Sequence, residues 1–119
     1  MVKLLIADYE YSFCKKVGEE MERRFDVQIL LATTLSEFRV HAFTADVIVI
    51  GPMLDGGKTT PYETIAYVCR KRSYMIPIVG CSCAHNRELL EAGCSTTVEG
   101  YWELLGILNE LLSASARKT

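Results

Sequence analysis

Short apolar runs alternate with helix-like periodicities along nearly the whole chain, and this alternation restricts the fold more than any other feature. Four branched aliphatic residues follow Asp46, a pattern typical of a central parallel strand that is covered on both faces. Similar runs, bounded by polar or turn residues, recur before and after it. The predicted strands span residues 4–7, 27–32, 47–50, 76–81 and 95–98.

Helical patterns fill the intervals between these runs. Phe13, Val17 and Met21 recur with the spacing of one helix face. Thr34 and Glu37 have the spacing of a capping box and predict that a helix starts there. Thr60, Pro61 and Glu63 predict the start of a further helix. Its apolar side consists of Tyr62, Ile65, Val68 and Cys69. A short helix is predicted to end at Gly93, and a last helix to run from Tyr101 to near Ser113.

Five β-α units in succession predict a doubly wound α/β fold, with a five-stranded parallel sheet between two layers of helices. The 119 residues suit a single domain, which we place at residues 1–112, with 113–119 as a polar tail or the start of a linker. The net charge of −2 gives no reason to expect nucleic-acid binding. We expect no leader and no membrane span, since no apolar stretch approaches about 20 residues; the predicted location is the cytoplasm.

Four sequence segments together resemble the receiver domain of bacterial response regulators, a CheY-like and flavodoxin-like fold. LLIADYE at residues 4–10 resembles the family's first strand and acidic turn, and residues 45–50 resemble the strand before the phosphorylated aspartate. IPIVGCSC at 76–83 and EAG at 91–93 resemble the fourth strand and the turn before the fifth. Their order and spacing carry the resemblance across nearly the whole chain, and it implies a role in two-component signal transduction.

Asp8 and Ser82 fit two of the family's functional positions, whereas Tyr9, Gly51 and Gly100 depart from the family pattern. The resemblance places the acidic pair on Asp8 and Tyr9, the phosphoacceptor on Gly51, the switch hydroxyl on Ser82 and the lysine on Gly100. Glycine offers no nucleophile for phosphoryl transfer and no oxygen ligand for Mg²⁺. The sequence therefore predicts a degenerate phosphoacceptor pocket, with no Mg²⁺, no cofactor and no enzymatic activity.

Two smaller departures agree with this interpretation. The switch aromatic of the fifth strand falls near Thr97, and Glu99 stands beside the position of the missing lysine. The helix between Ser82 and Gly93 is also shorter than the family's usual one. Phosphorylation by the family mechanism is thus not expected.

Other motifs have simpler explanations that we favour. The segment GPMLDGGKT at 51–59 is close to a P-loop, but Gly57 stands where the lysine belongs, so a β-α loop with turn glycines is expected. Cys81, Cys83 and His85, with Cys94 possible nearby, could bind zinc, but their spacing is not a zinc signature. The five cysteines are expected to be reduced and free of metal, and the carboxylates of Asp8 and Glu10 to form a solvated acidic turn.

The last helix has an apolar arc about twice the ~100° that covering a sheet requires. Trp102 could cover the sheet edge or face a partner, and both interpretations remain open at this point. The possible interface consists of Tyr101, Trp102, Leu105, Ile107 and Leu108.

The sequence favours a phosphorylation-independent pseudo-receiver that acts in bacterial signal transduction or transcription regulation through a protein partner or as a homodimer. The alternative is a flavodoxin-like protein that binds a small molecule or cofactor at the carboxyl ends of the strands. A third possibility is a thiol or metal sensor that uses Cys81 and Cys83. No DNA-reading element is expected in this chain.

Overall fold

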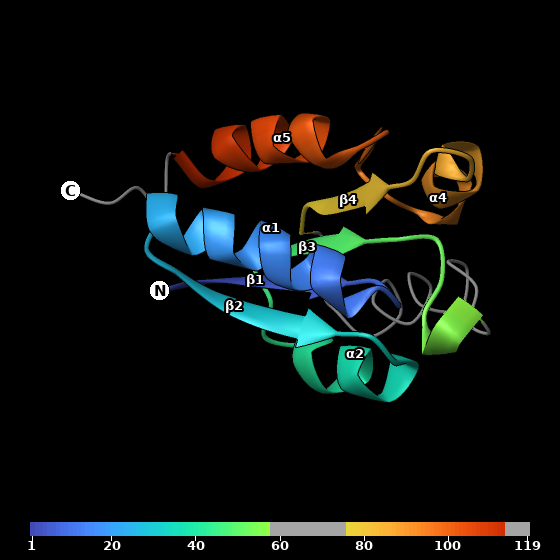
Figure 1. Cartoon of the computed structure of the whole chain (residues 1–119), viewed down its shortest axis with the longest axis horizontal. Helices are drawn as coiled ribbons and strands as arrows, with labels where there is room; N and C mark the ends of the chain where they lie inside the picture. Colours follow the sequence, from blue (N-terminus) through green and yellow to red (C-terminus); the bar gives the residue numbers. More distant parts are fainter. Residues whose placement is uncertain (58–75, 114–119) are drawn as a thin grey trace.

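The computed structural model describes residues 1–57 and 76–113, and in this part of the chain five parallel strands form one sheet (Figure 1). The order across the sheet is β2-β1-β3-β4-β5. The strands are β1 (Val2–Ala7), β2 (Val27–Ala32), β3 (Val47–Ile50), β4 (Ile78–Cys81) and β5 (Thr96–Val98). The predicted doubly wound parallel sheet is confirmed, and the predicted strands differ from the observed ones only at their ends.

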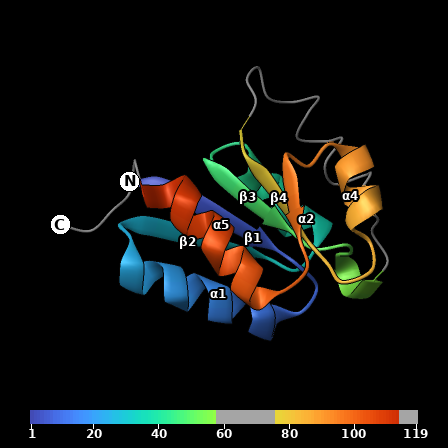
Figure 2. The ribbon, with the colours of Figure 1, turned by 90° about the horizontal axis from the view of Figure 1, so that it is seen from above.

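The helices lie on both faces of this sheet. Figure 2 shows α1 (Tyr11–Arg24) and α5 (Tyr101–Ser113) side by side over one face. The other face is covered by α2 (Leu35–Ala42) and α4 (Asn86–Ala92). The helix predicted from Thr60 and the polar tail predicted at 113–119 lie outside the described residues, apart from Ser113, which ends α5.

Alternation along each strand divides the core in two. Leu4 and Ile6 of β1 pack in the cluster that includes residues of α1 and α5. Leu5 and Ala7 of the same strand pack in the cluster that includes residues of α2 and α4. All four side chains are completely buried, as expected for a strand covered on both faces.

Local signals in the sequence fix two helix ends. Glu37 N donates to Thr34 Oγ1 at 3.1 Å and Thr34 N donates to Glu37 Oε1 at 3.3 Å, so the capping box predicted at the start of α2 is confirmed. Hydrogen bonds from the backbone N–H groups of Thr33 and Thr34 lower the pKa of Glu37. Gly93 ends α4 with φ of 122°, a conformation that favours glycine.

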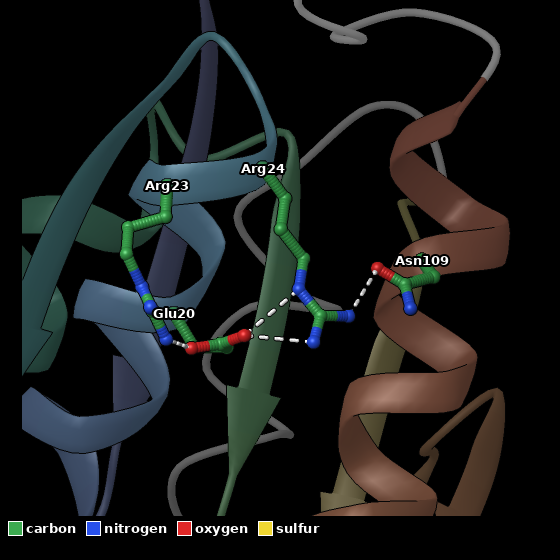
Figure 3. A network of polar contacts seen from close by, with 4 residues as sticks. All are labelled: Glu20, Arg23, Arg24 and Asn109. Atoms are coloured by element: carbon green, nitrogen blue, oxygen red, sulfur yellow. Dashed lines mark hydrogen bonds and ion pairs between the residues drawn. The ribbon is translucent and has the colours of Figure 1, made fainter.

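A polar cluster ties α1 to α5 at the end away from the carboxyl edge of the sheet (Figure 3). Arg24 Nη2 lies 2.7 Å from Glu20 Oε1, and its Nη1 donates to Asn109 Oδ1 of α5 at 3.2 Å. Arg23 also pairs with Glu20. These exposed contacts fix the position of α1 relative to α5 more than they stabilise the fold, since ion pairs of this kind contribute at most about 1 kcal/mol each. Among the described residues, no helix is long and apolar enough to cross a membrane.

Candidate functional site: a pocket at the carboxyl edge of the sheet

The carboxyl ends of β1, β3, β4 and β5 meet at one edge of the sheet, where doubly wound folds place their sites. The chain reverses its winding between β1 and β3, which are neighbours in the sheet although β2 separates them in sequence. A pocket of about 250 Å³ opens at this edge. Its lining comprises Asp8, Tyr9, Glu10, Phe13, Pro52, Cys81, Ser82, Cys83, Glu99 and Gly100.

The carboxylate of Asp8 stands directly over Gly51. A Cβ atom built on Gly51 would lie 1.9 Å from Asp8 Oδ2 and 2.6 Å from its Cγ. These distances are far below contact, so any side chain at position 51 must displace the carboxylate. Glycine at position 51 permits this close approach, and Asp8 fills the space through which a side chain at position 51 would extend.

Asp8 is buried by its neighbours and held by the turn that follows it. Its Oδ1 accepts a hydrogen bond from Glu10 N at 3.0 Å, and only 9% of the residue is exposed. Burial raises the pKa of Asp8, partly offset by the Glu10 N–H and reinforced by the negative charge of Glu10. The prediction of a solvated acidic turn at Asp8 and Glu10 is thus wrong for Asp8, since packing against Gly51 and α1 removes it from water.

Backbone hydrogen bonds anchor the described part of the loop after β3. Gly51 N donates to Ala7 O at 2.8 Å, and Tyr9 N donates to Met53 O at 3.2 Å. Asp55, in the left-handed region with φ of 54°, accepts from Leu35 N through Oδ2 at 3.2 Å. These bonds tie the loop to β1 and to the start of α2. Lys58 and the rest of the P-loop-like segment lie outside the described residues.

Ser82 lines the pocket, and its hydroxyl oxygen organises the turn into α4. Ser82 Oγ accepts hydrogen bonds from Ala84 N at 3.2 Å and His85 N at 3.0 Å. Asn86 Nδ2 donates to Val98 O at 3.0 Å, while its buried Oδ1 has no hydrogen-bond partner among the described residues. Ser82 thus has a structural role in shaping this edge.

The end of β5 contributes space and negative charge. A Cβ built on Gly100 would meet nothing within 4 Å, so the pocket is open where the resemblance places a lysine. Glu99 lines the pocket beside it, and Glu99 N donates to Glu103 Oε2 at 3.0 Å. Thr97, at the position of the switch aromatic, is half-buried in β5.

The thiols do not form one cluster. Cys81 packs in the core on the α1 and α5 side, whereas Cys94 packs on the α2 and α4 side. The possibility that Cys94 lies near Cys81 is therefore contradicted, because the two thiols pack on opposite faces of the sheet. Cys83 is exposed and donates from Sγ to Glu99 O at 3.3 Å. Within residues 1–57 and 76–113, no group of three or more histidine, cysteine or acidic side chains could hold a metal ion.

The predicted interface on α5 requires a correction. Leu105 is only 4% exposed and Leu108 is fully buried, because both pack in the core cluster that α5 shares with the sheet and with α1 beside it (Figure 2). Tyr101 and Ile107 are half-buried against the same core. Trp102, by contrast, is 79% exposed, which rules out its covering the sheet edge.

The structure also brings to the pocket one residue that the sequence analysis had not placed there, Phe13. Phe13 was assigned to the inner face of the first helix, but it reaches the pocket because α1 begins at that edge.

Comparisons with solved structures decide the fold. The receiver domain of DrrB, activated by BeF₃, superposes with a TM-score of 0.78 at 19% identity and covers 95% of this chain and 98% of its own. The receiver domain of Francisella response regulator 1452 gives 0.76 at 20% identity, covering 97% and 99%. The chain has the receiver fold.

A third receiver structure shows what such a pocket can contain in another protein. The receiver domain of the sensor histidine kinase PA1611 from Pseudomonas aeruginosa, with a magnesium ion coordinated in its active-site cleft, gives a TM-score of 0.69 at 18% identity. It covers 94% of this chain and 98% of its own. No family model and no curated protein matches this sequence. The receiver fold is therefore established by structure, and the chemistry of the pocket must be argued from its own residues.

Proposed function

We propose that this chain is a phosphorylation-independent pseudo-receiver, a non-enzymatic module of the cytoplasm that acts in bacterial signal transduction or transcription regulation by contact with another protein. The observation that carries the proposal is the position of Asp8 over Gly51. A receiver that used this edge for phosphoryl transfer would need a nucleophile at position 51, and here that space holds the carboxylate of another residue.

Two further features support the same conclusion. The described lining of the pocket has three carboxylates, those of Asp8, Glu10 and Glu99, and no basic side chain. A phosphoryl group would meet repulsion there, without the cations that stabilise phosphoryl transfer. Asp8 alone would also be a poor Mg²⁺ site, since Tyr9 and Gly51 add no carboxylate where the metal would need one.

The alternative function, binding of a small molecule or cofactor, has less support. The pocket at this edge has about 250 Å³, below the usual ~300–1,000 Å³ of such sites. Its acidic lining is also unsuited to the phosphate groups of most nucleotide and flavin cofactors.

Exposed aromatic surface supports the contact role. Trp102 is 79% exposed and packs edge-to-face on Tyr101, with ring centroids 5.2 Å apart. Lys16 Nζ lies 4.3 Å from the centre of the Tyr101 ring, which holds that ring in place beneath Trp102. An exposed tryptophan is a common anchor of protein interfaces, so we place the contact with a partner, or with a second copy of this chain, around Trp102.

Two measurements test the proposal. After incubation with acetyl phosphate and Mg²⁺, intact-mass analysis should show no phosphoryl adduct, and Gly51→Asp should not create one. Sedimentation over a concentration series should show self-association that Trp102→Ala weakens and Val40→Ala leaves unchanged, since Val40 is 70% exposed on α2, on the other face. A stoichiometric phosphoryl adduct on the parent would contradict the proposal, and a parent that remains monomeric would restrict it to a different partner.

A further inference from the structure

Two thiols line the pocket at the carboxyl edge of the sheet, and the proposed function uses neither. Cys81 ends β4, and both Cys81 and Cys83 belong to the lining as free cysteines. Cys83 is exposed, whereas Cys81 is 7% exposed and packs in the core on the α1 and α5 side. A reagent from solvent therefore meets Cys83 first, with the second thiol lining the same cavity.

The backbone keeps these two thiols within reach of a covalent bond. Side chains alternate along an extended strand, so residues separated by one position lie on the same side. Ser82 N donates to Val98 O at 3.1 Å, so pairing with β5 continues one residue past the end of β4. Two extended residues span at most about 7 Å between Cα atoms, and disulfides form over Cα separations of about 4.4–6.8 Å. A slight closure of the chain is enough, and it falls where β4 has already ended.

Burial and charge give the two thiols different reactivities. Burial raises the pKa of Cys81 to about 11, and the negative charges of Asp8, Cys83 and Glu103 reinforce this shift. The effect of Cys83 on Cys81 agrees with the short distance that the backbone imposes. Because the thiolate is the reactive form of cysteine, Cys81 is protected from reagents in solvent. An oxidant therefore reacts at Cys83, and Cys81 is reached through a Cys83 that has already been oxidised.

We infer that Cys81 and Cys83 are a redox pair that forms a reversible disulfide when the protein meets hydrogen peroxide. The Cys83 thiolate attacks one peroxide oxygen, the O–O bond breaks, and the other oxygen leaves as water once protonated, so that Cys83 becomes a sulfenic acid. The Cys81 sulfur then attacks the Cys83 sulfur, the S–O bond breaks, and a second water leaves with the Cys81 proton. Two electrons pass from the two thiols to one peroxide, and a thiol reductant reverses the reaction.

The disulfide would change the hydrogen bonds at the start of α5. In the reduced protein Cys83 Sγ donates to Glu99 O at 3.3 Å, and Glu99 N donates to Glu103 Oε2 at 3.0 Å. A disulfide sulfur has no proton, so the hydrogen bond to Glu99 O is lost on oxidation. Trp102, 79% exposed, lies in the same first turn of α5. The inference thus goes beyond the proposed contact function and places an oxidation site beside the surface assigned to that contact.

The test treats the reduced full chain with hydrogen peroxide, alkylates it under denaturing conditions and maps the tryptic peptides by mass. Cleavage after Arg72 and Arg87 gives a peptide of residues 73–87 whose only cysteines are Cys81 and Cys83. That peptide should lose two hydrogens and take up no alkylating reagent, and dithiothreitol should restore both thiols. In ¹H–¹⁵N spectra of the oxidised chain the amide of Gly100, which shares its peptide bond with Glu99 O, should shift.

Two variants assign the roles of the thiols. Cys83→Ser, a substitution at an exposed site, should leave Cys81 as a thiol and slow its oxidation by at least about tenfold, because a buried thiol with a raised pKa is seldom ionised. Cys94→Ala, on the other face of the sheet, is the matched control and should give the same lighter peptide as the parent.

Three results would overturn the inference. A Cys83 sulfenic acid trapped by dimedone while Cys81 stays reduced would show that the second thiol does not reach the first. A disulfide between two chains would assign Cys83 to a contact between copies. Equal oxidation of Cys81 in Cys83→Ser would show that Cys83 is not the point of entry. Each of these results leaves the pseudo-receiver proposal intact, because that proposal is decided by the phosphoryl adduct.

Discussion

Replacing Gly51 with alanine should destabilise the protein through a single contact, the one with Asp8. The new Cβ would lie 1.9 Å from Asp8 Oδ2, so the carboxylate must rotate away. That rotation breaks the hydrogen bond from Glu10 N at 3.0 Å, worth about 1.5–3 kcal/mol for a charged acceptor. An unfavourable rotamer would add about 0.5–1.5 kcal/mol. Alanine restricts the unfolded chain and returns about 0.4–1 kcal/mol, so the free energy of unfolding should fall by a net amount of roughly 1–4 kcal/mol.

A double-mutant cycle isolates this contact. The free energy of unfolding is measured by urea denaturation, followed by circular dichroism, for the parent, Gly51→Ala, Asp8→Ala and the double variant. In the Asp8→Ala background the obstructing carboxylate is absent, so Gly51→Ala should be neutral or stabilising by up to about 1 kcal/mol. Gly106→Ala on α5, where a Cβ would meet nothing within 4 Å, is the matched control. If Gly51→Ala had the same cost in both backgrounds, within about 0.5 kcal/mol, the steric argument would be refuted.

Three further predictions concern burial. Burial raises the pKa of Asp8 above its ordinary value of 3.8, so the folded state binds the proton more tightly than the unfolded chain does. The free energy of unfolding should therefore fall as the pH rises through that raised pKa. Urea denaturation at several pH values should show that Asp8→Asn loses this pH dependence. When a thiol reagent is added to the folded protein and the modified sites are mapped by peptide mass, exposed Cys83 should react faster than buried Cys81. Burial also raises the pKa of the Cys81 thiol to about 11, so Cys81 should react only after unfolding. Gly80→Ala should cost about 1–3 kcal/mol in urea denaturation, because its Cβ would lie 3.0 Å from Leu89 Cβ; Gly106→Ala should instead stabilise α5 by up to about 1 kcal/mol.

The sequence predicted the layers of this fold well because each strand and helix carries a local signal. The run at 47–50 and the Thr34–Glu37 capping box needed no tertiary information. The same reasoning failed for α5, where periodicity shows how wide the apolar arc is but not which neighbour covers it. Leu105 and Leu108 are buried because α1 packs beside them, a contact between segments far apart in the chain.

For the candidate site, the sequence suggested which residues to consider and gave no geometry. The resemblance placed Asp8, Gly51, Ser82 and Gly100 at one edge, and the structure brings Asp8 to within contact of Gly51 and places Asp8, Ser82 and Gly100 around one pocket. Nothing in the sequence indicated that the Asp8 carboxylate would lie over Gly51, because that approach depends on the pairing of β1 with β3. The same pairing of β1 with β3 accounts for the burial of Asp8. Neighbouring residues in the sequence alone had suggested that its carboxylate is solvated.

The most direct test of the central claim is whether a phosphoryl mimic binds the pocket. Beryllium fluoride and Mg²⁺ are added together to the ¹⁵N-labelled chain, and the amide signals of Gly51, Ser82 and Gly100 are followed. With Asp8 over Gly51 and no nucleophile at that position, these signals should stay where they are at every concentration of the mimic. Saturable shifts of these three amides, lost when Mg²⁺ is removed, would show that the pocket still accepts a phosphoryl group and would contradict the pseudo-receiver account.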